Sequence, residues 1–141
     1  MGDYRKLVVW QRSTALTDQI REVVSRLPAN ERRRLGDQAC RAADSIPLNI
    51  AEGCGLNADS QLARHLSYAI GSANELQEIV DAVARRGQLD SAYQTLPAEL
   101  TRLRSMLAVF HKRVSEAEGS KPARPPQQSN PSKKRKPRKR A

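Results

Sequence analysis

The residues of this sequence best suited to chemistry are two histidines, two cysteines and a run of lysines and arginines near the C-terminus. His65 and His111 have neither a cysteine nor a paired carboxylate at catalytic spacing, which indicates surface or interface histidines. Cys40 and Cys54 are 14 residues apart, and no histidine stands near either at metal-ligand spacing. We expect them to be buried or idle thiols in a reducing, cytoplasmic compartment.

The loops and motifs of common catalytic sites are missing from the sequence. It contains no GxxxxGK[ST] or GxGxxG loop to cradle phosphate and no HExxH motif to bind zinc. The sequence therefore predicts a protein that is not an enzyme. No cofactor, metal ion or small-molecule substrate is expected.

The basic run places seven cations in eight residues: Lys133, Lys134, Arg135, Lys136, Arg138, Lys139 and Arg140. A flexible chain of this kind binds polyanions by releasing their counterions, which predicts binding to RNA or DNA. The alternatives are a solubilising tail or contact with an anionic membrane. Because the run has no aromatic residue on which bases could stack, its sequence preference should be weak.

A second basic cluster, Arg32, Arg33 and Arg34, falls at the start of an expected helix. Its positive charge opposes the helix dipole there, so stability does not explain it. The cluster is either a nucleic-acid contact or a solvated turn.

The net charge of +10 is unevenly distributed along the chain. Residues 119–141 hold nine basic residues and no acid, which leaves a net charge of +1 for residues 1–118. The same C-terminal stretch has no aliphatic residue larger than alanine, so it cannot bury enough apolar surface to offset its ordering entropy. We therefore expect a folded domain over residues 1–118 and a disordered basic tail over residues 119–141.

Apolar residues in the folded part recur at alternating steps of three and four, the pattern of closely packed α-helices. It predicts four helices whose apolar stripes run from Val9 to Leu27, from Leu35 to Ile50, from Leu62 to Val83 and from Leu89 to Val114. Pro97 should break or kink the fourth helix near its start. Short connections between such helices favour an antiparallel up-down-up-down four-helix bundle, an all-α fold. Further apolar residues outside the core stripes, such as Val8 and Ile70, predict a homo-oligomer.

No apolar run in the sequence approaches the ~18 residues that a membrane span needs. The charged N-terminus also lacks the apolar core of a signal peptide. We therefore expect a cytoplasmic protein with no membrane partner.

One segment, residues 45–53, carries a proline and a glycine inside a helical context. Pro47 leaves the carbonyl of Ala43 without its helical donor, and Ser45 and Asn49 are close enough to serve the loosened turn. The sequence indicates a kinked structural helix here in preference to a ligand site.

With Tyr4-Arg5-Lys6-Leu7 before it and Ala69-Ile70-Gly71-Ser72-Ala73-Asn74-Glu75-Leu76 after it, this segment resembles one bacterial family. These are four-helix-bundle proteins first noted as reading frames in 23S ribosomal RNA intervening sequences. The accessory variability determinants of diversity-generating retroelements belong to the same superfamily. The resemblance covers about residues 4–115 and implies a homopentameric barrel. For the retroelement branch it also implies a basic surface that engages nucleic acid and a reverse transcriptase.

The turn near Asn57 predicts which residues of the second and third helices face each other. If the two helices are antiparallel, the numbers of facing residues sum to about 114 to 116. Arg41 then meets Glu75, and Glu52 meets Arg64. These pairs are either partly buried ion pairs that fix the register or solvated charges worth under ~1 kcal/mol each.

Overall fold

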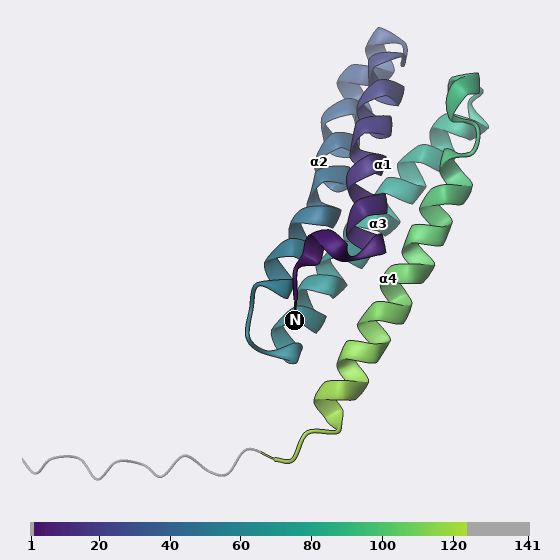
Figure 1. Cartoon of the computed structure of the whole chain (residues 1–141). Coiled ribbons are helices and arrows are strands. Elements are labelled where there is room, and N and C mark those ends of the chain that lie inside the picture. The colour runs from purple at the N-terminus through teal and green to yellow at the C-terminus, as the bar shows by residue number, and fades with distance from the viewer. Residues whose placement is uncertain (1, 124–141) are drawn as a thin grey trace, which may run out of the picture.

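The computed structural model describes residues 2–123, and these residues form four long helices and two short 3₁₀ turns (Figure 1). The long helices are α1 (Val8–Ser25), α2 (Ala29–Cys54), α3 (Asp59–Arg85) and α4 (Leu96–Gly119), and the short turns are η1 (Tyr4–Lys6) and η2 (Ser91–Tyr93). No strand occurs within the described residues. The predicted all-α fold with four helices is therefore confirmed.

Successive helices run in opposite directions, so α1 and α3 point one way and α2 and α4 the other (Figure 1). The main packing contacts join α2 to α3, α3 to α4 and α1 to α2, whereas α1 and α4 touch less extensively. One face of each helix supplies the core. On α3 the predicted stripe is buried at every position: Leu62, Leu66, Ala69, Ala73, Leu76, Val80 and Val83.

The end of α3 shows how a turn residue sets the topology. Gly87 has a φ of +67°, a left-handed conformation that glycine adopts at little cost. The amide of Gln88 then bonds the Val83 carbonyl at 3.0 Å, and that of Gly87 bonds the Ala84 carbonyl at 3.0 Å. This paired closure satisfies the last carbonyls of the helix and turns the chain back toward α4.

The fourth helix begins later than the sequence pattern predicts. Leu89 is buried but lies outside the helices, and Asp90 starts η2 by accepting a hydrogen bond from the Ala92 amide at 2.9 Å. Pro97 therefore lies in the first turn of α4, where its missing N–H costs no helical bond, and does not interrupt a longer helix. Pro47, by contrast, lies inside α2, which continues through it.

Among the described residues, no helix is both long enough and apolar enough to cross a membrane.

Candidate functional site

The basic run from Lys133 to Arg140 lies outside the described residues, but the structure shows where the chain leaves the bundle. At the end of α4, Lys121 Nζ lies 2.7 Å from Asp59 Oδ2 at the start of α3 and 3.1 Å from Glu118 Oε2. The hydrogen bond to Asp59 and that to Glu118 raise the pKa of Lys121. The first residues of the expected tail are thus attached to the bundle at the start of α3, while the end of α4 lies at the lower end of the molecule in Figure 1.

The arginine cluster at the start of α2 is divided by its contacts. Arg34 bonds Glu31 at 2.8 Å, and Arg86 reaches the same carboxylate oxygen from the end of α3 at 3.3 Å. Arg32 donates to the Ser25 carbonyl at 3.3 Å, across the turn from α1. Two of the three arginines therefore fasten this end of the bundle, and within residues 2–123 only Arg33 of the cluster has no such contact.

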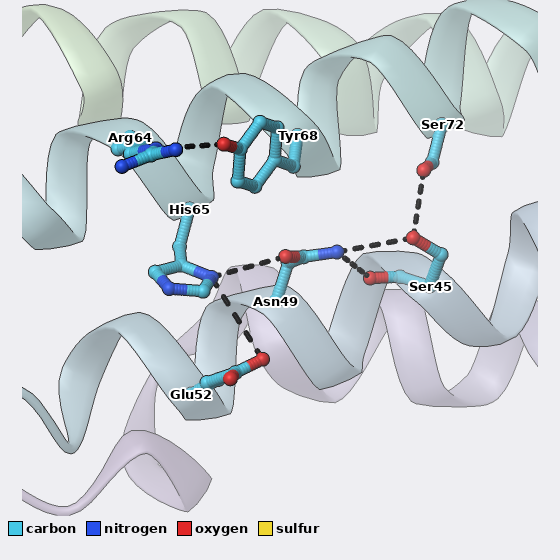
Figure 2. Close-up of polar contacts among 7 residues, drawn as sticks. All are labelled: Ser45, Asn49, Glu52, Arg64, His65, Tyr68 and Ser72. Carbon is cyan, nitrogen blue, oxygen red and sulfur yellow. Dashed lines mark hydrogen bonds and ion pairs between the residues drawn. The ribbon is translucent and has the colours of Figure 1, made fainter.

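A chain of polar side chains runs between α2 and α3 in the segment that contains Pro47 (Figure 2). The Asn49 amide Nδ2 donates to the Ser45 carbonyl at 2.8 Å and to Ser45 Oγ at 3.0 Å. Ser45 Oγ in turn lies 2.8 Å from Ser72 Oγ on α3. Asn49 and Ser45 thus join α2 to its neighbour, but among the described residues neither side chain bonds the Ala43 carbonyl that Pro47 leaves without its helical donor.

The same network fixes the tautomer of His65. Because Nδ2 of Asn49 faces Ser45, its Oδ1 faces the histidine and accepts from His65 Nδ1 at 3.1 Å. The proton therefore lies on Nδ1, and Glu52 Oε2 stands 3.8 Å from the same nitrogen (Figure 2). A neutral Nδ1–H is already sufficient for this contact, so the arrangement orients the ring without requiring a charge.

The predicted register of α2 against α3 is correct, but the predicted ion pairs are not formed. Asn49 opposes His65 and Gly53 opposes Leu62, with residue numbers that sum to 114 and 115. The four charged side chains choose other partners. Arg41 lies 3.9 Å from Asp37, Glu75 accepts from Gln38 at 2.8 Å, Glu52 faces His65, and Arg64 donates to the Tyr68 hydroxyl at 2.7 Å.

The rotation of the helices about their own axes explains the difference. Arg41 is 83% exposed and Glu52 67% exposed, so both lie at the solvent-exposed edge of the α2–α3 interface, although their backbone positions are opposite the predicted partners. Smaller polar side chains, Ser45, Asn49 and Ser72, fill the interface instead. Arg41 and Arg64 bond groups on their own helices. Glu52 and Glu75 reach across the edge of the interface to His65 and Gln38.

Gly53 allows the closest approach between the two helices. A Cβ at this position would stand 2.9 Å from His65 Cβ and 2.9 Å from Leu62 Cδ1. A glycine is therefore required for the helices to approach as closely as they do, and this approach places His65 against Asn49. The segment is a structural joint between α2 and α3.

Within residues 2–123, the two cysteines and His111 show no arrangement for nucleophilic catalysis. Burial raises the pKa of the Cys40 and Cys54 thiols, which disfavours the reactive thiolate. His111 Nε2 lies 3.1 Å from Ser67 Oγ, but that hydroxyl also donates to the Ala63 carbonyl at 3.1 Å. The Ser67 hydroxyl has a single hydrogen, which it donates to the Ala63 carbonyl, so His111 must donate its own N–H to the Ser67 oxygen. A base that activates a nucleophile would instead accept the proton of the hydroxyl.

The family comparison is consistent with this fold. A family model described as the 23S rRNA-intervening sequence protein matches residues 5–109. The chain belongs to this family. A comparison with curated proteins found no match.

The family match begins in η1 and ends inside α4, so it covers the helices and the polar network but stops before the basic tail. Family membership therefore accounts for the bundle. The tail's role has to be argued from its charge.

The polar network leads to a stability prediction for Asn49. Replacing Asn49 with leucine removes the partners of His65 Nδ1 and of Ser45, and leaving partly buried polar groups unpaired costs about 1–3 kcal/mol. Thermal or urea unfolding should show that loss. Gln61→Leu, at an exposed position of α3, is the control and should change the free energy of unfolding by less than about 0.5 kcal/mol. Equal stability of Asn49→Leu and the wild type would contradict a structural role.

Proposed function

We propose that this protein is a non-enzymatic, oligomeric helical scaffold that holds RNA or DNA through its basic C-terminal tail. The observation that carries the proposal is the distribution of charge. Residues 119–141 hold nine of the ten net positive charges, whereas the preceding 118 residues are almost neutral. A polyanion binds most strongly where many cations lie close together, because binding there releases the most counterions.

The contacts of the described residues support the tail over the bundle. Arg32 and Arg34 are occupied in fastening the ends of the helices, and Arg21 and Arg26 bond Asp44 and Asp90. These four arginines of the bundle are thus already bonded, three of them to acids, which weakens the positive surface around them. Lys121 is held against Asp59, so the eight basic residues beyond it form the candidate binding segment.

An oligomer would make weak tails effective. Once one tail is bound, the others act at an effective concentration of order millimolar, which can raise the apparent affinity by about 10² or more. A homopentamer is the assembly that the family resemblance implies. A reverse transcriptase is the candidate protein partner if the gene belongs to a retroelement, and a reverse-transcriptase gene with a template repeat beside it would favour that role.

The alternative function is a structural or protein-interaction module whose basic tail only aids solubility. The extent of the family match favours this second candidate, because the match covers residues 5–109 of the bundle and stops before the basic run. Deleting the tail distinguishes the two functions, because the first predicts a loss of nucleic-acid affinity and the second predicts only a loss of solubility.

Deleting residues 124–141 tests the proposal. The cut leaves Lys121 on Asp59, so helix content and particle size should stay unchanged. The dissociation constant for a fluorescent random-sequence RNA or DNA should rise by a factor on the order of 100. The control replaces Arg32, Arg33 and Arg34 with alanine and should retain most of the affinity. Full affinity in the truncated protein would move the binding surface to the bundle and overturn the proposal.

A further inference from the structure

The seam between α1 and α4 is open, because each of these helices packs mainly against its other neighbour. Two grooves follow this seam. One is lined by Arg12, Leu16, Glu99, Arg102 and Leu103, and the other by Leu7, Val8, Met106, Val109, Phe110 and Arg113. Both grooves combine residues of the two helices, so they form one surface along the seam, which we call the α1–α4 groove.

The floor of the second half is apolar and exposed to solvent. Val8 is 51% exposed and Val109 50% exposed, and Met106 and Phe110 are only partly covered by the core. Four large apolar side chains gathered at one place are more than the scattered apolar residues of an ordinary surface. A protein segment that covered them would bury apolar area from both partners.

The rim of the groove is positively charged. Arg12, Arg102 and Arg113 line it, and none of them forms an ion pair with another described residue. Glu99 is the single acid among the described lining residues, and it already accepts a hydrogen bond from Thr95 at 3.1 Å. The groove therefore suits an apolar ridge flanked by acids.

The outer face of α2 has these features. Leu48 is 65% exposed, more than any other large apolar side chain among the described residues. Asp37, Arg41, Leu48 and Glu52 are spaced so that they follow one stripe of the helix, and the carboxylates of Asp37 and Glu52 are 95% and 67% exposed. The stripe carries an apolar knob with an acid on either side along the helix, and its one cation, Arg41, is paired with Asp37 at 3.9 Å.

We propose that the α1–α4 groove of one copy receives the outer face of α2 from a second copy. Leu48 enters the apolar floor between Val8 and Val109, and Asp37 and Glu52 face the arginine rim. This inference rests on the proposed oligomeric scaffold and specifies its contact surface. Because α2 packs between α1 and α3, its outer face is distinct from the groove, so the contact is heterologous. Repeated contacts of that type close into a ring or continue as a filament.

Two variants of the full chain test the contact, each blocking one side of it. Val109→Glu places a charge in the groove and leaves α2 intact, whereas Leu48→Arg places a cation opposite the arginine rim and leaves the groove intact. Both positions are exposed, so the monomer fold should persist, as circular dichroism would check. By light scattering each variant alone should have the mass of one 15.7 kDa chain. Ala108→Glu, one residue along on α4 and outside the groove, should assemble like the wild type.

Mixing the two variants gives the decisive result. The intact α2 of Val109→Glu can enter the intact groove of Leu48→Arg, but no second contact of this type can form. The mixture should therefore contain a one-to-one dimer and nothing larger. Variants that assemble like the wild type, or a mixture that stays monomeric while the wild type is oligomeric, would overturn this contact and leave the scaffold function standing. A monomeric wild type would overturn both the contact and the oligomeric scaffold.

Discussion

Replacing Gly53 with alanine should destabilise the bundle, whereas the same replacement at Gly71 should stabilise it. The added methyl at Gly53 would meet His65 Cβ and Leu62 Cδ1 at 2.9 Å, so α2 and α3 must move apart. Overpacking of this kind costs about 1–3 kcal/mol, of which the better helix propensity of alanine returns up to about 1 kcal/mol. We therefore expect a net loss of about 1–2 kcal/mol.

Gly71 provides the matched control, because it is also helical but a Cβ there would meet nothing within 4 Å. Alanine at this position should gain about 0.5–1 kcal/mol from helix propensity alone. Chemical denaturation of both variants at one protein concentration measures the difference, since assembly makes stability depend on concentration. A gain in stability for both variants would mean that the α2–α3 contact is looser than the structure has it.

The core could be predicted from the sequence because burial follows the helical period closely. On α3 and α1 the steps of three and four led directly to the buried residues, including Ser13, which occupies an apolar slot and donates its hydroxyl to the Trp10 carbonyl at 2.9 Å. The period failed at the start of α4. Leu89 and Tyr93 continue the heptad spacing, but Asp90 caps a 3₁₀ turn, so local turn chemistry overrides the pattern.

The site was predicted less completely, because helix register and helix rotation are separate quantities. The turn length set the register correctly, and applied to Asn49 the same rule identifies His65 as the facing residue. The sequence interpretation left open whether His65 lies on the surface or at an interface, and it sought the contacts between the two helices among long charged side chains. Which of two adjacent positions enters the interface depends on the rotation of each helix, and that follows from the packing of the whole core.

The α1–α4 groove could not have been found from the sequence stripes alone. In the sequence, Val8 and Val109 are apolar residues beside the core stripe of a helix, and Leu48 is one residue of a kinked helix. Only the arrangement of four helices shows that α1 and α4 leave their shared seam partly open. The excess of apolar residues predicted that some surface would be covered, and the structure gathers Val8, Met106, Val109 and Phe110 in one groove.

Nucleic-acid binding by the full chain should be strongly dependent on salt. If the tail neutralises six or more phosphates of duplex DNA, the plot of log affinity against log salt concentration should have a slope steeper than about −5. Affinity should then fall by a factor of about 10³ between 50 and 200 mM salt. The sequence supports that number of contacts, because eight basic residues follow Ala123 and no acid is among them.

Fluorescence anisotropy across a salt series measures the slope, and the chain without residues 124–141 is the matched control. Its slope should shrink toward that of a nearly neutral protein, since only Lys121 of the nine tail cations remains and it is paired with Asp59. A random-sequence competitor should displace a chosen sequence nearly as well, because phosphate contacts carry no base information and the tail has no aromatic side chain. An unchanged slope after truncation would show that the bundle binds the phosphates, with Arg33 and the arginines of the α1–α4 groove as the cations to test next.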